Sequence, residues 1–122
     1  MRTAVLTVEY PSRASYYQDW RDAFLAAPGL SASAVNLMAA GARAAVARAA
    51  REAELIVALH AVTADTLAHA APVADALADR RGRLVAFVGN ELNSPLAPLG
   101  AKIAWLRRVR PDIVATQLLQ EA

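Results

Sequence analysis

The segment RLVAFVGNELNS, residues 83–94, decides the fold of this chain. It begins with an uninterrupted apolar run, residues 84–88, which is typical of a strand buried on both faces of a parallel sheet. Gly89, Asn90 and Glu91 follow this run directly. Ligands of open α/β folds bind at the carboxyl ends of the strands, so we expect a functional site where this strand ends.

Length and composition limit the classes of protein to which the chain can belong. A chain of 122 residues is expected to form one domain with a substantial core. It has no cysteine, which excludes disulfides and thiolate metal sites. Its apolar runs are strand-sized and its first residues do not resemble a signal peptide, so we expect a cytoplasmic protein without a membrane span. The 13 basic and 11 acidic residues are spread evenly, and we expect no nucleic-acid partner.

Apolar runs and turn signals divide the chain into alternating strands and helices. Strands are predicted at residues 3–8, 31–38, 54–61, 84–88 and 112–118. A capping box of Ser15 and Gln18 begins a helix that ends before Pro28. Further helices are predicted at residues 41–52, at residues 63–81 with an interruption at Pro72, and at residues 99–110.

This alternation predicts an α/β fold with an open, doubly wound, mostly parallel five-stranded sheet, Rossmann-like, with helices on both faces. Right-handed crossovers leave few strand orders, of which we expect 3-2-1-4-5. Residues 1–122 are expected to form a single domain. Only residues 119–122 follow the last predicted strand, so we expect the chain to be a piece of a longer protein.

Several motifs of well-known α/β proteins are absent from the sequence. No G-x-G-x-x-G follows a predicted strand and no P-loop motif occurs, which argues against a nucleotide held on a glycine-rich turn. A phosphoacceptor receiver domain needs an aspartate at the end of the third strand and a lysine after the fifth. Here the third strand ends at His60 and the fifth contains Thr116 and Gln117, which argues against that class.

Polar residues gather at the predicted carboxyl ends of the strands. They are Glu9, Tyr10, His60, Asn90, Glu91 and Gln117. Because these ends meet at one edge of a parallel sheet, a histidine beside carboxylates could perform general acid–base chemistry there or bind the hydroxyls of a sugar. We expect His60 and Glu91 to be catalytic and the other four residues to bind substrate, without a metal. A structural interpretation also stands, in which His60 ends an apolar strand and residues 89–90 form a turn.

The first helix carries three aromatic residues, Tyr17, Trp20 and Phe24, on one face. Such a stripe is more often part of a core than a platform on which ligands stack. We therefore expect these side chains to be buried.

The last helix carries an apolar stripe and a basic face. The stripe is predicted to consist of Leu99, Ile103 and Leu106. The basic face consists of Lys102, Arg107, Arg108 and Arg110, and we expect it to be solvated.

Three stretches together resemble a known family. They are SYYQDWRDAFLAAPGL at residues 15–30, RRGRLVAFVGNELNSP at residues 80–95 and AKIAWLRRVRPDIVATQLLQEA at residues 101–122. They resemble the start of bacterial glycosyltransferases of the two-domain GT-B type, in the group called families 1 and 4. The resemblance implies an N-terminal, Rossmann-like domain that contributes the acceptor side of an interdomain cleft and is inactive alone.

The same resemblance implies the partners of this domain. A sugar or glycan acceptor would bind here, and a C-terminal domain outside these residues would bind the nucleotide-sugar donor, so that this piece needs no cofactor. His60, Asn90 and Glu91 match, by location, the residues that face the transferred sugar in the family. The glycine-rich loop that many members have after the first strand is absent here, which leaves that loop's contact to the donor without a counterpart.

Two other functions remain open at this point. The chain could be a small flavodoxin-like enzyme that processes a nucleoside or a sugar, with Glu91 as nucleophile or base. It could also be a non-catalytic α/β binding module that pairs with a partner protein through a sheet edge or through the basic helix.

Overall fold

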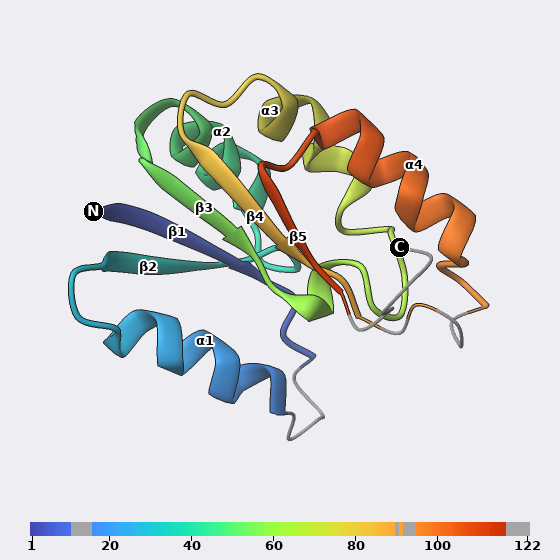
Figure 1. The fold of residues 1–122 in the computed structure, drawn as a ribbon, viewed down its shortest axis with the longest axis horizontal. Coiled ribbons are helices and arrows are strands. Elements are labelled where there is room, and N and C mark those ends of the chain that lie inside the picture. Colours follow the sequence, from blue (N-terminus) through green and yellow to red (C-terminus); the bar gives the residue numbers. More distant parts are fainter. Residues whose placement is uncertain (11–15, 90, 92–94, 117–122) are drawn as a thin grey trace.

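The computed structural model describes residues 1–10, 16–89, 91 and 95–116, and it confirms the predicted open parallel sheet. The strands are β1 (Arg2–Thr7), β2 (Ser31–Asn36), β3 (Leu55–Ala58), β4 (Arg83–Phe87) and β5 (Ile113–Ala115). All four pairs of neighbouring strands are parallel (Figure 1). The helices are α1 (Tyr16–Ala26), α2 (Ala42–Glu52), α3 (Ala74–Ala78) and α4 (Leu99–Val109), with short 3₁₀ turns at His60–Val62 and Ala71–Val73.

The strand order is β2-β1-β3-β4-β5, so the expected order 3-2-1-4-5 is wrong. The difference arises because α2 carries the chain back across β1, and β3 then pairs with β1 instead of β2. Five of the six residues of β1 are buried, as a strand with a neighbour on each side requires. Strand β2 presents Ser31 and Ser33 to solvent, which suits an edge. The topological switch point therefore lies between β1 and β3.

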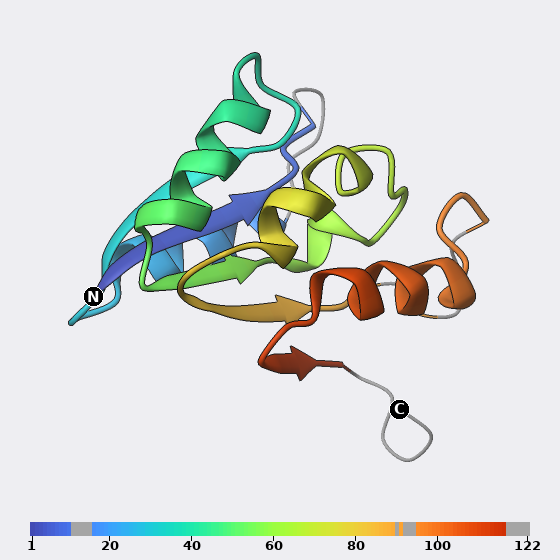
Figure 2. The same ribbon diagram turned by 90° about the horizontal axis from the view of Figure 1, so that it is seen from above.

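Helices cover the two faces of the sheet unequally. Figure 2 shows α2, α3 and α4 together over one face, and Figure 1 shows α1 alone against the other. The larger core cluster lies on the three-helix side and includes Leu6, Ile56 and Leu84. On the α1 side a smaller cluster of Val5, Val57 and Leu59 packs with Phe24, among others. Ile113 of β5 pairs with Val85 and therefore lies on the same face of the sheet as α1. It is 59% exposed, because α1 covers only the strands at the other end of the sheet.

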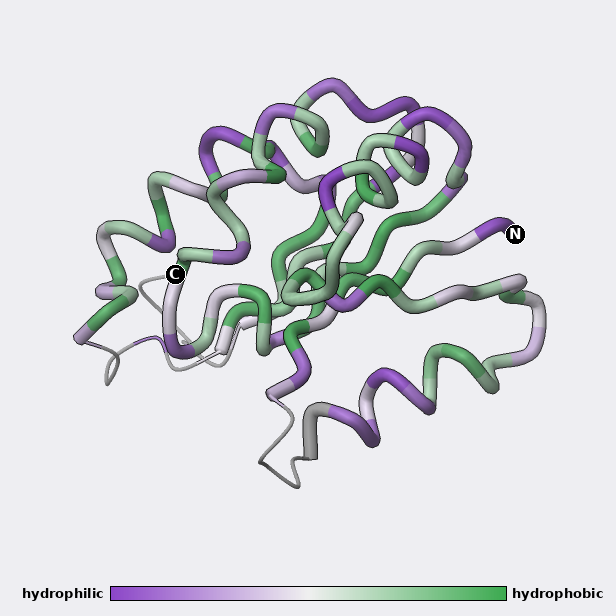
Figure 3. Tube along the Cα trace, turned by 180° about the vertical axis from the view of Figure 1, so that it is seen from behind, coloured by the Kyte–Doolittle hydropathy of each residue, from purple (hydrophilic) through white to green (hydrophobic). Residues whose placement is uncertain are grey.

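Hydropathy follows these layers. In Figure 3 the strands form a continuous apolar interior, and the helices alternate between hydrophilic and hydrophobic turns. In the part of the chain that the structure describes, none of the helices has both the length and the apolar character that crossing a membrane would require.

The helix predicted at residues 63–81 is mostly absent, and only Ala74–Ala78 is α-helical. In the preceding loop the hydroxyl of Thr66 accepts the backbone N–H of Ala68 at 3.1 Å. A side-chain acceptor of this kind competes with helical hydrogen bonds, and Pro72 has no N–H to donate. The loop is nevertheless well packed, because Val62 and Ala70 are fully buried in the core.

Arg80 holds the junction between α4 and β5 together at the amino-terminal edge of the sheet. Its guanidinium donates to the carbonyl oxygens of Val109 at 2.6 Å, Arg110 at 2.7 Å and Leu77 at 2.9 Å. It also donates to the Asp112 carboxylate at 3.1 Å. One side chain thus satisfies carbonyls that the end of α4 leaves without helical partners.

Candidate functional site

The carboxyl ends of the parallel strands form one edge of the sheet (Figure 1), and two predicted catalytic residues follow strands that end there. His60 begins the 3₁₀ turn just after β3, and Glu91 follows the adjacent strand β4. Thr116 comes directly after β5. The topology therefore places a histidine, a carboxylate and a hydroxyl at the ends of three consecutive strands.

His60 lies in a cluster of aromatic rings that we call the aromatic cluster, formed by Trp20, Phe24, His60 and Phe87. The His60 ring centroid is 4.9 Å from that of Trp20 and 5.0 Å from that of Phe87. Burial lowers the pKa of His60, and the nearby Glu91 carboxylate opposes this shift only in part. The imidazole is therefore neutral at pH 7 and can accept a proton.

Trp20 differs from the prediction that its helix face would be buried. The residue is 41% exposed, although its ring contacts both His60 and Phe87. Phe24, one turn further along α1, packs edge-on against Phe87 at 6.0 Å and is partly buried as expected.

Glu91 is a buried carboxylate, only 8% exposed. The hydroxyl of Thr116 donates to its Oε1 at 2.9 Å, which joins the loop after β4 to the end of β5. The carboxylate also raises the pKa of both His60 and Lys102 against the effect of burial. Glu91 therefore interacts electrostatically with two basic groups at the edge of the sheet.

Lys102 is fully buried, so its assignment to the solvated basic face is wrong. Its Nζ donates to the carbonyl oxygen of Ala64 at 3.0 Å and to that of Gly89 at 2.8 Å. Burial lowers its pKa, while the carboxylates of Glu91 and Asp65 favour the charged form. The amine thus connects the loop after β3 to the loop after β4.

The spacing on α4 contains a signal for this burial. Lys102 shares a stripe with Trp105 and Val109, and all three are buried. The expected stripe is wrong in part, because Ile103 is 38% exposed. Helix α4 is therefore rotated about its axis from the predicted orientation. Trp105 and Val109 follow Lys102 by three and seven residues, and this helical spacing indicates that the lysine shares their buried face. Arg107, Arg108 and Arg110 are exposed, as predicted.

Gly89 lets the two loops approach closely. A Cβ at this position would lie 3.2 Å from the Cβ and the carbonyl oxygen of His60 and 3.3 Å from the Cβ of Ala64. Contacts this short are tighter than side chains normally make. The glycine is therefore needed for space, beside the carbonyl that Lys102 binds.

The other predicted substrate-binding residues have different surroundings. Glu9 forms an ion pair with Arg21 of α1, and its backbone N–H donates to Oδ1 of Asn36 at 3.1 Å. Tyr10 is partly buried and packs against the larger core cluster. Glu9 thus ties α1 and β2 to the end of β1. Asn90 and Gln117 lie outside the described residues.

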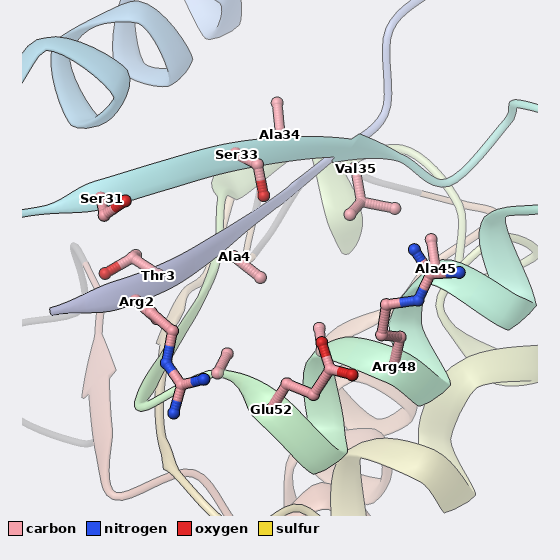
Figure 4. A pocket seen from close by; sticks show the side chains of 12 residues that line it. Arg2, Thr3, Ala4, Ser31, Ser33, Ala34, Val35, Ala45, Arg48 and Glu52 are labelled. Atoms are coloured by element: carbon pink, nitrogen blue, oxygen red, sulfur yellow. The ribbon is translucent and has the colours of Figure 1, made fainter.

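Three cavities lined by described residues lie away from His60 and Glu91. One of about 400 Å³ lies between β2 and α2, and Figure 4 shows Ser33 and Val35 of the strand opposite Arg48 and Glu52 of the helix. Another, of about 300 Å³, is lined by residues that include Leu37, Arg43 and His69. The third, of about 410 Å³, lies around Arg80 and Asp112 at the opposite edge of the sheet. Within the described ranges no group of three or more histidine, aspartate or glutamate side chains is arranged to hold a metal ion.

Comparison with known proteins assigns no family or function to this geometry. No protein-family model matches the chain, and no curated protein matches it in sequence.

Proposed function

We propose that this chain is the acceptor-side domain of a glycosyltransferase of the GT-B type, which moves a sugar from a nucleotide-sugar donor to an acceptor. One observation carries the proposal: a neutral histidine, His60, lies at the same edge of the sheet as the buried carboxylate of Glu91 and interacts with it electrostatically. The resemblance of residues 15–30, 80–95 and 101–122 to that family adds independent support.

In the proposed reaction His60 acts as a general base. It accepts the proton of an acceptor hydroxyl as the hydroxyl oxygen bonds to the anomeric carbon of the donor sugar. The bond from that carbon to the nucleotide phosphate breaks, and the nucleotide leaves with its electron pair. The lowered pKa of His60 keeps the imidazole neutral, which is the form that accepts a proton. The Glu91 carboxylate then stabilises the imidazolium that forms.

A transfer assay tests this role of His60. The protein translated from the reading frame that encodes these residues is incubated with nucleotide sugars and candidate acceptors, and products are identified by mass spectrometry. We expect His60→Ala to lower kcat by about 100-fold or more, the usual contribution of a general base. His69→Ala is the matched control, because His69 is the other histidine of the chain and lines the cavity beside α2.

Two results would contradict the proposal. One is a protein that transfers no sugar, or whose His60→Ala and His69→Ala variants are equally active. The other is tight binding of a nucleotide sugar by the 122 residues alone, measured by isothermal titration calorimetry, because the proposal assigns the donor to a second domain.

The strand order favours a second candidate, a flavodoxin-like enzyme that processes a nucleoside or sugar. The order β2-β1-β3-β4-β5 is the one found in flavodoxin-like sheets. In this candidate Glu91, oriented by Thr116, is the nucleophile or base. Cleavage of a glycosidic bond by the purified chain, lost in Glu91→Gln, would support it over the first proposal.

A further inference from the structure

Trp20 is the one exposed aromatic residue among the side chains that the structure describes. Exposing the large apolar surface of an indole to water costs free energy, and tryptophan is frequent in binding sites. Trp20 also lies at the functional edge of the sheet, since its ring contacts His60. The indole therefore borders His60, to which we assign the role of general base.

The indole is held in place from several directions. Its contacts with His60 and Phe87 support one side of the ring at centroid distances of 4.9 and 5.7 Å. The next residue, Arg21, forms the ion pair with Glu9 that fixes α1 to the end of β1. Phe24 packs against Phe87 one turn later. A ring that is already ordered loses little entropy when a ligand binds to it.

We propose that Trp20 is a stacking platform for the ring of a saccharide whose hydroxyls reach His60. This inference rests on the proposed function and specifies how its acceptor is held. The C–H groups on one face of a pyranose carry partial positive charge and suit the negative face of an indole. The hydroxyls at the ring edge suit a neutral imidazole, which can accept a hydrogen bond.

The ring geometry favours a saccharide over a nucleobase. The rings around Trp20 are tilted to it, by 53° for His60 and 47° for Phe87, so these rings do not form parallel walls to enclose a planar base. The neighbouring titratable groups also favour a ligand rich in hydroxyls over a purely apolar one. A single aromatic face beside polar groups is therefore matched to one face of a sugar.

Ligand-observed NMR on the full 122-residue chain tests the platform. The probes are methyl α-D-glucopyranoside, methyl β-D-galactopyranoside and N-acetylglucosamine at millimolar concentration, with adenosine as the planar probe. We expect at least one saccharide to bind and Trp20→Ala to weaken its affinity about tenfold, with Trp20→Phe between the two. The matched control is Leu25→Ala, an exposed apolar residue of the same helix, which should keep the affinity within about twofold.

A second measurement needs no variant. Acrylamide quenches the fluorescence of an exposed indole, and the other tryptophan, Trp105, is buried and donates to the carbonyl of Ala70. A saccharide on Trp20 should therefore reduce quenching in the unmodified chain.

The inference is overturned if no saccharide binds, if adenosine alone binds through Trp20, or if Trp20→Ala and Leu25→Ala bind equally well. Its failure is distinct from that of the proposed function, because binding is measured here without a donor. Trp20-dependent binding in a protein that transfers no sugar would leave the platform standing and refute the transferase.

Discussion

Gly82 stands where a side chain has no room, and Gly100 stands where one would fit. A Cβ on Gly82 would lie 2.3 Å from the carbonyl oxygen of Ala53 and 2.6 Å from that of Glu54. Both are backbone atoms next to the start of β3, and they cannot move without shifting the strand. A Cβ on Gly100, in the first turn of α4, meets no atom within 4 Å.

These surroundings predict opposite effects of the same substitution. Gly82→Ala is expected to lower the free energy of unfolding by about 3 kcal/mol, because the backbone must shift to relieve the overlap. Gly100→Ala is expected to raise it by up to about 1 kcal/mol, since alanine favours a helix over glycine. Urea unfolding of both variants measures the two values. Equal effects would show that the close approach at Gly82 does not constrain the fold.

At this scale the sequence predicted that His60 and Glu91 lie at one edge of the sheet, but not which residues surround them. Their common position was predictable because parallel strands bring their carboxyl ends to one edge, which is a rule of topology. The predictions that Lys102 is exposed and Trp20 is buried are wrong, because they followed residue type and not the position of each residue on its helix. A lysine is seldom fully buried, and an aromatic stripe is usually core, yet the rotation of α4 buries the lysine and the edge of α1 exposes the tryptophan.

The junction of α4 with β5 depends on one side chain from another element. Arg80 follows α3 and donates to carbonyl oxygens at the end of α4 and to Asp112, which precedes β5. The same carboxylate accepts the backbone N–H of Leu84 at 2.9 Å. Arg80 and Asp112 thus connect the segment from α3 to β4 with the segment from α4 to β5.

Removing the guanidinium is therefore expected to destabilise the whole fold. Arg80→Met would leave the carbonyls of Val109 and Arg110 without this donor, at a cost of about 2–3 kcal/mol in the free energy of unfolding. Arg81→Met is the matched control and should change it by less than about 0.5 kcal/mol, because Arg81 is exposed. Guanidinium chloride unfolding compares the two, and similar losses would refute the role of Arg80.

Elements with a strong period were predictable, and the irregular ones were not. The five strands and three of the four helices lie where apolar runs and turn residues indicated, within a few residues. The helix prediction is wrong for residues 63–73. Their apolar residues are spaced as in a helix, but Thr66 and Pro72 disrupt helical hydrogen bonding. The predicted strand order is also wrong, because the local sequence does not determine on which side of β1 the next strand pairs.

For the molecule as a whole, His60 and Asp112 contribute to a dependence of stability on pH in different ranges. Burial lowers the pKa of His60 below 6.5 in the folded state, so the unfolded chain binds this proton first. The backbone N–H of Leu84 and the Arg80 guanidinium lower the pKa of Asp112 below 3.8. In both cases the unfolded state takes up protons more readily, and stability is lost as the pH falls.

We therefore expect the free energy of unfolding to fall from about pH 6.5 downward, with a second decrease from about pH 4. His60→Gln should remove the first decrease and keep the second. Asp112→Asn should keep the first and reduce the second, to which Glu54 also contributes because the backbone N–H of Arg2 lowers its pKa. Urea unfolding across this pH range separates the two contributions. A first decrease of unchanged size in His60→Gln would mean that another group causes it.

The amine of Lys102 has a mechanical consequence for any ligand that reaches this edge. Because a single ammonium group binds main-chain carbonyls in the loops that follow the third and fourth strands, displacing one of these two loops strains the other. We therefore expect the loops that carry His60 and Glu91 to move together when a molecule binds at this edge.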